Sequence, residues 1–290
     1  MRIFVAGATG VVGRQLVPML LAAGHQVTGS SRTAAGAARV AALGGTGAQA
    51  DALDPAGLRA AVLAAEPEVV VHQLTDLSGA DGAANGRLRR EGTRNLVAAA
   101  KEAGVARFVA QSICWAYAPG AEPASELVEL DPSEQQPRAR TVAAVRALEE
   151  SAAELPGAVV LRYGLLYGPG TWYAPGGAVA AALGGGRAAP FLGSTEADGA
   201  VSSFVHTADA AGAVLAALDW PGGPVNIVDD EPAAARDWLP VLAAALGVPA
   251  PVPAPSAERP GWARGASNAL ARGRGWRPGR ASWRTGFAQQ

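Results

Sequence analysis

The 290-residue chain contains one cysteine, one lysine and few aromatic residues, which make up 6% of it. The single Cys114 excludes an internal disulfide, and no spacing typical of a zinc site occurs, so we predict no metal site. Such cysteine usage is typical of a reducing compartment, and we expect a cytoplasmic protein. No apolar run reaches the about 18 residues that a membrane-spanning helix needs, so we expect no membrane association.

The chain also lacks an excess of charge of either sign. Charged residues make up 17% of the chain and nearly cancel, which leaves a formal net charge of -1. Because the arginines are spread along the sequence without a basic block, we expect no nucleic-acid partner. With 49% hydrophobic residues, a chain of this length can bury a substantial core. We expect a globular monomer or homodimer that binds a small molecule.

Short apolar runs alternate with Ala- and Leu-rich stretches of helical character. The runs are RIFVAGA, HQVTGSS, GGTGAQAD, EVVVHQL, RFVAQS and AVVLRYG. This alternation predicts an α/β fold of Rossmann type, a doubly wound parallel sheet between helices. We assign residues 1–166 to a dinucleotide-binding core. The Gly- and Pro-rich residues 167–290 are expected to form a small C-terminal substrate-binding lobe, interleaved with the last Rossmann elements at about 201–228.

The segment GATGVVG follows the first predicted strand and precedes a helix. Gly7, Gly10 and Gly13 allow a tight turn, a close approach of the backbone to a pyrophosphate, and close packing of the helix on the strand. This placement predicts a dinucleotide site whose turn also includes Thr9, Val11 and Val12. A purely structural turn is the alternative.

The second predicted strand ends in Ser30, Ser31 and Arg32, where a site for NAD would carry an acidic residue. A hydroxyl and a guanidinium instead suit the 2′-phosphate of NADP, because arginine donates two parallel hydrogen bonds. We therefore predict that Ser31 and Arg32 favour NADP(H), with NAD(H) as a second cofactor. A merely solvated Arg32 is the alternative.

Several further segments carry a family resemblance: QADALD, VVVHQLT, GTRNLVAAAKEAGVARFVAQS, LRYGLLYGPG, FVHTADAAGAVLAAL, VNIVDDEP and GWRPGRASWRTGF. Together with GATGVVG they resemble the extended or atypical short-chain dehydrogenases/reductases, the NAD-dependent epimerase/dehydratase-like group. The resemblance covers essentially the whole chain. It implies a Rossmann-type fold and a nicotinamide dinucleotide as cofactor.

The resemblance also implies where further residues lie along the cofactor. Asp51 and Ala52 would lie by the adenine. The segments that follow the fourth, fifth and sixth strands would run along the nicotinamide half: Gln73, Leu74 and Thr75, then Gln111 and Ser112, then Tyr163, Gly164 and Leu165. For Tyr163, packing as a core aromatic is an equally good interpretation.

The sequence departs from the family where the proton is handled. Thr141 and Val145 stand where the family carries Tyr-x-x-x-Lys, and Ile113 stands where it carries a serine or threonine. Arg89 replaces a common asparagine, and the only lysine, Lys101, lies at a polar helix end. Ser112 is one residue from the serine position, which on a strand points its side chain to the other face. We therefore assign no catalytic residue.

Aromatic residues gather in the segments that follow the fifth and sixth predicted strands. Together with one histidine they form the predicted substrate site: Trp115, Tyr117, Trp172, Tyr173, Phe204 and His206. Such rings suit a large flat ligand better than a sugar nucleotide. Ordinary packing is the alternative interpretation for about half of them. Tyr117 and His206 are the remaining candidate proton donors.

These patterns favour an NADPH-dependent ketoreductase that acts on a polycyclic aromatic ketone. The loss of the whole triad in an otherwise intact family frame resembles the angucyclinone ketoreductases, which implies an angucyclinone-like polyketide substrate and a role in antibiotic biosynthesis. A phenol of the substrate, or water, would supply the proton in place of a Tyr/Lys pair. The alternative is a catalytically silent NADP(H)-binding sensor. A sugar epimerase or dehydratase is disfavoured, because these reactions ordinarily use the missing tyrosine as acid or base.

Overall fold

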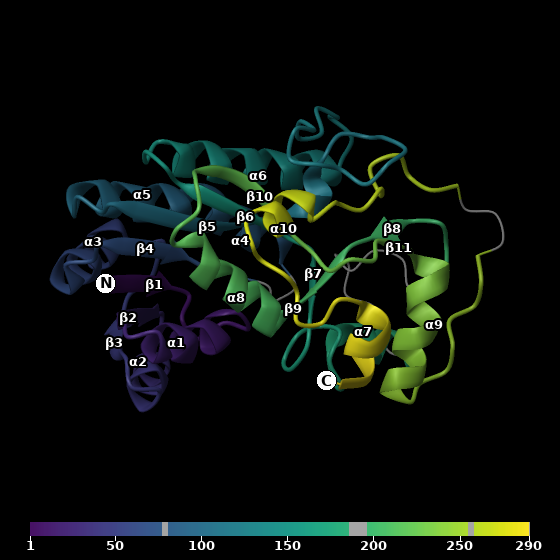
Figure 1. Ribbon diagram of the computed structural model, residues 1–290, viewed down its shortest axis with the longest axis horizontal. Helices are drawn as coiled ribbons and strands as arrows, with labels where there is room; N and C mark the ends of the chain where they lie inside the picture. The colour runs from purple at the N-terminus through teal and green to yellow at the C-terminus, as the bar shows by residue number, and fades with distance from the viewer. Residues whose placement is uncertain (77–80, 186–195, 255–257, 290) are drawn as a thin grey trace. The chain divides into compact units, whose positions relative to one another are not determined.

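A computed structural model describes residues 1–290 except 77–80, 186–195, 255–257 and 290. Its main sheet has seven strands in the order β10-β6-β5-β4-β1-β2-β3 (Figure 1). The strands are β1 (Arg2–Ala6), β2 (Gln26–Ser31), β3 (Thr46–Gln49), β4 (Val69–His72), β5 (Arg107–Ile113), β6 (Val159–Tyr163) and β10 (Gly223–Ile227). The strand order reverses between β1 and β4, and ligands of doubly wound folds bind outside the carboxyl ends of the strands at such a point. The predicted Rossmann-type fold is confirmed.

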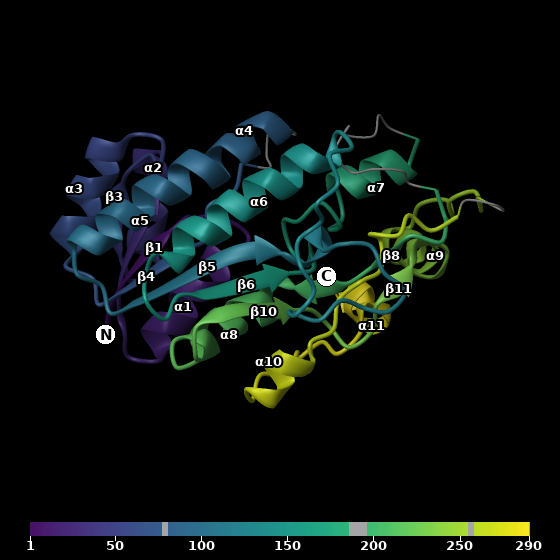
Figure 2. The ribbon, with the colours of Figure 1, turned by 90° about the horizontal axis from the view of Figure 1, so that it is seen from above.

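Helices cover both faces of this sheet, with α5 and α6 on one face and α1 and α8 on the other (Figure 2). The helices that join its strands are α1 (Gly13–Ala22), α2 (Ala34–Ala42), α3 (Pro55–Ala65), α4 (Gly82–Arg87), α5 (Thr93–Glu102), α6 (Arg138–Ala153) and α8 (Thr207–Ala217). Between α4 and α5 lies a π-helix, η1 (Leu88–Gly92). Two sequence signals explain local helix starts, since Thr33 caps α2 and Asp54 caps α3 with side-chain oxygens.

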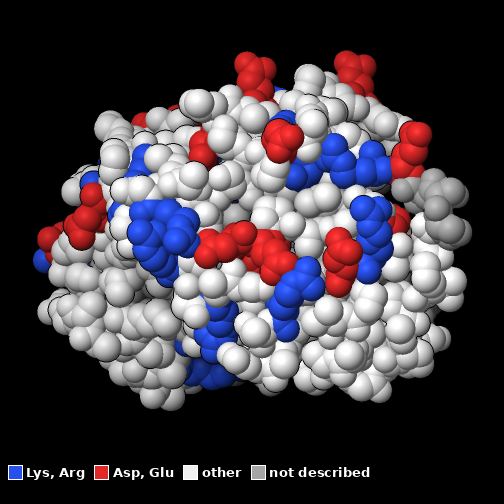
Figure 3. Space-filling view, turned by 45° about the vertical axis from the view of Figure 1, so that its right-hand side comes forward, with Lys and Arg blue, Asp and Glu red and all other residues white. Residues whose placement is uncertain are grey.

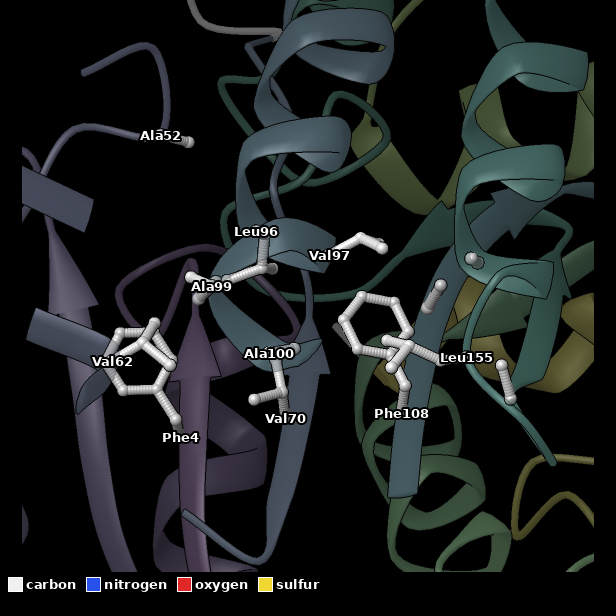
Figure 4. Packing of buried hydrophobic residues seen from close by; sticks show 14 of the residues in the cluster. Phe4, Ala52, Val62, Val70, Leu96, Val97, Ala99, Ala100, Phe108 and Leu155 are labelled. Carbon is white, nitrogen blue, oxygen red and sulfur yellow. The ribbon is translucent and has the colours of Figure 1, made fainter. Parts of the chain in front are cut away.

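The core under α3, α5 and α6 is apolar and closely packed (Figure 4). Phe4 of β1 and Phe108 of β5 are completely buried, and Leu96 of α5 packs in the same cluster. The strand residues are apolar on both faces because helices cover both. This burial fixes the register of the parallel strands and therefore the positions of the loops at their carboxyl ends.

The chain divides into two compact units. The first comprises Met1–Ser112, Gln136–Leu161 and Ala211–Pro224, and the second comprises Ile113–Gln135, Arg162–Ala210 and Val225–Gln290. The second unit contains β7 (Leu165–Tyr167) paired with β9 (Phe204–His206), and β8 (Val201–Ser202) paired with β11 (Ala233–Ala234). Its helices are α7 (Ala178–Leu183), α9 (Ala235–Leu246), α10 (Ala269–Gly273) and α11 (Trp283–Gly286), with 3-10 turns η2 (Cys114–Ala116) and η3 (Phe287–Gln289). Assignment of residues 167–290 to substrate binding stays a prediction.

Positive and negative side chains are interspersed on the face drawn in Figure 3. Oppositely charged side chains that are distant in the sequence also form ion pairs, for example Arg272 with Asp230 at 2.8 Å and Arg284 with Glu231 at 2.5 Å. The near-zero net charge is therefore distributed on this face without a large patch of one sign.

Gly7 packs closely against another backbone segment at the carboxyl edge of the sheet. Its φ is +87°, and a Cβ at this position would lie 2.4 Å from the carbonyl oxygen of Gln73. Both features require glycine, because other residues adopt such a φ at a cost and no backbone atom can move aside cheaply. The turn after β1 is thereby held against the end of β4.

We predict that Gly7→Ala lowers the free energy of unfolding by about 2–4 kcal/mol, the sum of the left-handed φ and the overpacking. Gly24→Ala is the matched control, because Gly24 has a φ of +82° and no atom lies within 4 Å of the place that its Cβ would occupy. It should cost only the conformational part, about 1–2 kcal/mol. Urea denaturation measures both, and equal losses would show that the contact with Gln73 is unimportant.

Candidate active site

The turn between β1 and α1 has the features of a phosphate site. Helix α1 begins at Gly13 without a side-chain cap, and its first turn carries no acidic residue. Its N-terminal N–H groups and the positive end of its dipole are thus suited to an anion. Gly10 is exposed, and a Cβ there would approach only the carbonyl oxygen of Gly7, at 3.4 Å. Thr9 and Val11 are partly exposed beside it, whereas Val12 is buried. This turn fits a pyrophosphate.

The end of β2 carries the residues predicted to select the cofactor. The Arg32 guanidinium lies 3.4 Å from a carboxylate oxygen of Asp76, and the Arg32 side chain is 62% exposed. Exposed pairs of this kind contribute little, so Arg32 has donors left for a 2′-phosphate. Ser31 lies against α2, where a Cβ on Gly36 would collide with its hydroxyl. Asp76 is a competitor for Arg32 that the sequence pattern did not reveal.

The predicted adenine segment is fixed by an asparagine that the sequence analysis missed. Asn95 of α5 donates its side-chain N–H to the carbonyl oxygen of Ala52 at 2.8 Å. Asp51 accepts a hydrogen bond from the backbone N–H of Leu53 at 2.9 Å, which closes a turn. Ala52 is buried and Asp51 is exposed. Only Asp51 therefore offers a side chain that a nucleotide can reach.

The carboxyl ends of β4 and β5 are tied together by side-chain hydrogen bonds. Gln111 donates its side-chain N–H to the carbonyl oxygen of Leu74 at 2.7 Å. Ser112 donates its hydroxyl to the Glu149 carboxylate of α6, also at 2.7 Å. Gln73 is buried and its backbone N–H bonds to the carbonyl of Ala6 at 2.8 Å, whereas Thr75 is exposed. The structure thus brings the segments 73–75 and 111–112 to one edge of the sheet, and their place along a nicotinamide stays a prediction.

Helix α6 carries the two positions where the resemblance implies Tyr and Lys. Val145 is completely buried, and Thr141 is partly buried. Lys101 lies at the exposed end of α5, as predicted, and pairs with Glu154 at 2.5 Å. No ammonium is therefore available beside Val145. The carboxylate of Glu149, one turn further along α6, is engaged by Ser112.

In the second unit, Tyr163, Gly164 and Leu165 form a closely packed joint. The Gly164 N–H bonds to the Ile227 carbonyl at 3.1 Å, and the Leu165 N–H bonds to the Ser203 carbonyl at 2.8 Å. Gly164 is required here, because a Cβ would lie 2.7 Å from the Ser203 carbonyl oxygen. Tyr163 is only 2% exposed. Contact with the carboxamide of a nicotinamide stays a prediction.

Tyr117, a candidate proton donor, is committed to a structural network. Its hydroxyl donates to the side-chain oxygen of Asn226 at 2.6 Å, and the Arg162 guanidinium lies 4.8 Å from its ring centroid. The side chain is 1% exposed, and burial raises the pKa of Tyr117 well above its usual range although Arg162 opposes this. Such a phenol is a poor acid at neutral pH.

The other predicted substrate residues differ in exposure. Phe204 is completely buried, and its ring packs edge-on against Tyr173 with centroids 5.5 Å apart. His206 is also buried, accepts the Ala208 N–H at 3.1 Å, and has its pKa lowered mainly by that burial. Trp115 and Trp172 are partly exposed. Among the six, these two tryptophans have the most surface to offer a ligand.

One buried charged residue, Arg89, was not among the site residues predicted from the sequence. Arg89 of η1 is 8% exposed, and it lies near His72, the last residue of β4. The signal for it was present, because Arg89 falls on the helical face that also carries Asn85, Thr93 and Leu96, all of which are buried. An arginine at such a position is rarely buried without a partner.

Outside the gaps in the described chain, no helix has the length and apolar character needed to cross a membrane. The same residues include no group of three or more His, Cys, Asp or Glu side chains arranged to hold a metal ion. Cys114 is buried, and this burial raises the pKa of its thiol to about 12.

Comparisons with known proteins agree with this geometry. Residues 3–227 match the model of the NAD dependent epimerase/dehydratase family. A 3-diazoavenalumate denitrifying reductase from a Streptomyces species is 44% identical, with all of both chains covered. The UDP-glucose 4-epimerase of Thermus thermophilus, solved with NAD, is 27% identical with a TM-score of 0.75, over 99% of this chain and 97% of the epimerase. The Thermotoga maritima epimerase shares the fold, with 21% identity and a TM-score of 0.77 over 99% of this chain and 96% of that one.

The family match covers most of the chain, and the uncapped start of α1 after β1 is compatible with the phosphate site that it implies. Together with the full-length reductase relative, it identifies an NAD(P)-dependent oxidoreductase with a nicotinamide dinucleotide as cofactor. The chain belongs to the NAD-dependent epimerase/dehydratase family.

Proposed function

We propose that this protein is an NADPH-dependent reductase that acts on an electrophilic aromatic substrate without a proton donor from the protein. The observation that carries the proposal is which residues occupy the positions where related enzymes handle the proton. Val145 stands at the lysine position, but it is an apolar core residue and supplies no cation to Thr141. The Tyr117 hydroxyl donates its hydrogen bond to Asn226. An epimerase or dehydratase reaction is disfavoured, because it needs an acid or base at these positions.

The first substrate class is an aromatic diazo compound, as the name of the Streptomyces relative suggests. The bound nicotinamide would supply a hydride, so that an aryl diazonium ion becomes an arene and dinitrogen without net uptake of a proton. When the ring that carries the diazo group also carries a phenolate, the product is a phenolate after hydride transfer. Its oxygen can then take one proton from water. A site without a general acid suits this reaction.

The second substrate class is a phenolic polycyclic ketone, as in angucyclinone-like polyketides. A vacant triad in an intact family frame is reminiscent of the simocyclinone-type angucyclinone 7-ketoreductase. Reduction of a ketone places negative charge on oxygen, and an acid that offsets it contributes about 10² to 10⁴ in rate. A neighbouring phenol of the substrate would offset the charge here. We rank the diazo class first, and the name of the full-length relative supports this order.

We predict NADPH consumption, with release of dinitrogen, when the protein receives the diazo compound made from 3-amino-4-hydroxybenzoic acid. The expected products are 4-hydroxybenzoate and NADP⁺ in equal amounts, measured by NADPH absorbance and liquid chromatography. Hydroxyanthraquinones and their methyl ethers test the ketone class in the same assay. If NADPH binds but neither class is reduced, the silent sensor becomes the better interpretation.

We predict that NADPH binds more tightly than NADH and that Arg32→Ala removes at least about tenfold of this preference, because charge-assisted hydrogen bonds contribute about 1.5–3 kcal/mol. Arg39→Ala on the exposed face of α2 is the matched control. Asp76→Asn should strengthen NADPH binding, because it removes the carboxylate that competes for Arg32. Fluorescence titration measures each constant, and an unchanged ratio in Arg32→Ala would refute the assignment.

We predict that Thr141→Ala changes the reduction rate by less than about threefold, because the proposed reaction uses no acid at this position. Val145→Ala should lower the free energy of unfolding by about 1–3 kcal/mol with a similarly small effect on rate. Single-turnover rates with saturating NADPH separate chemistry from binding. A loss of more than about 100-fold in Thr141→Ala would make its hydroxyl an acid-base participant.

A further inference from the structure

The π-helix η1 carries an arginine into the interior of the first unit. Arg87 and Arg90 on either side are exposed, whereas Arg89 is 8% exposed. The buried residues Asn85, Thr93 and Leu96 lie at helical spacing from it, so Arg89 is on the inward face of the run from α4 to α5. Single π-helical turns occur frequently at functional sites.

This buried guanidinium lacks a carboxylate partner among the residues that the structure describes. Arg87 pairs with Glu91 at 2.7 Å, but Arg89 forms neither an ion pair nor a hydrogen bond there. Burial alone lowers the pKa of Arg89 to about 10, and no acidic group raises it. Residues 77–80, outside the described chain, are Leu, Ser, Gly and Ala, so they include no acid. Arg89 therefore remains a buried, uncompensated cation at neutral pH.

The neighbouring histidine is also incompletely satisfied and does not offset the charge. His72 is completely buried, and its Nε2 lies 2.9 Å from the Thr93 hydroxyl, while its Nδ1 has no partner in the described structure. Burial, with a smaller contribution from the charge of Arg89, lowers the pKa of His72 to about 4. The imidazole is therefore neutral at neutral pH and leaves the charge of Arg89 without compensation.

Their position in the fold separates this cation from the phosphate sites. His72 directly precedes Gln73, whose backbone is hydrogen-bonded to β1 at the carboxyl edge. The π-helix packs against α6, the helix of Thr141 and Val145. The groups predicted to bind the phosphates of the cofactor are the α1 N-terminus and Arg32. An anion at Arg89 would lie near the positions where related enzymes handle the substrate proton.

We propose that Arg89 binds a phenolate oxygen of the aromatic substrate, next to the group that accepts the hydride. This assignment rests on the proposed function and specifies how the substrate is held. The Arg89 guanidinium stabilises the ionised phenol by pairing with its negative charge, which stays on the substrate. A phenol is then required for recognition of the diazo substrate, whose reduction needs no acid.

The test uses a chromogenic phenol that accepts no hydride under the assay conditions, 4-nitro-1-naphthol, with the full chain loaded with NADP⁺. The fraction ionised is followed by absorbance as a function of pH. Wild type and the control Arg90→Ala should lower the apparent pKa of the bound phenol by at least about one unit, a tenfold change in ionisation. Arg89→Met should abolish this shift, and Arg89→Lys should restore part of it.

Two further measurements separate this role from a structural one. Arg89→Met keeps the apolar stem and removes an uncompensated charge, so its urea midpoint should be equal to or higher than that of wild type. A clearly lower midpoint would mean that Arg89 is a structural residue and would overturn the proposal. NADPH affinity should be unchanged in Arg89→Met, and a tenfold loss would assign the cation to a cofactor phosphate instead.

The outcomes also distinguish this inference from the proposed function. A phenol shift that depends on Arg89, without turnover of any aromatic substrate, would support the binding site and reject the reductase. Turnover of diazo or ketone substrates with no phenol shift, or equal turnover of their methyl ethers, would support the reductase and reject the role of Arg89.

Discussion

The contact between Gly7 and the Gln73 carbonyl is the constraint on which the rest of the first unit depends. A side chain at Gly7 would lie 2.4 Å from that oxygen, so only glycine lets the turn after β1 reach the end of β4. This approach places the start of α1 and the segment Gln73–Thr75 at one edge of the sheet. The turn predicted to bind the phosphates and the segment predicted to lie along the nicotinamide are therefore set by the same backbone packing, and not by two independent loops.

The fold could be predicted from the sequence because its signals are local and consistent. Runs such as RIFVAGA and EVVVHQL are apolar on both faces, and the glycines of GATGVVG follow the first of them directly, so strand, turn and helix agree. The contacts that position the site could not be predicted in the same way. Asn95 reaches the Ala52 carbonyl across 43 positions of sequence, and Asp76 meets Arg32 across 44, and no periodic pattern encodes such pairs.

The candidate substrate residues show a different limit of sequence patterns. An aromatic residue after a strand predicts a ring near the sheet edge, but it does not tell whether the ring faces a ligand or the core. Phe204 and Tyr173 pack edge-on in the core of the second unit, whereas Trp115 and Trp172 keep exposed surface. Burial depends on the partners that the chain folds over them, such as Trp238, which lies 5.1 Å from Phe204 between ring centroids.

The lack of a general acid on α6 and the presence of the buried cation Arg89 have a common explanation. A buried cation without a carboxylate costs stability in the absence of ligand, and a purely structural site would be better filled by an apolar side chain. Tyr117 cannot take over the proton, because its hydroxyl is bonded to Asn226 and burial favours its neutral form. A diazo substrate that carries a phenolate meets both conditions, since the phenolate pairs with the guanidinium and the diazo group accepts a hydride without an acid on α6. The protein then contributes position and a compensating charge, and none of its residues has to replace the catalytic tyrosine.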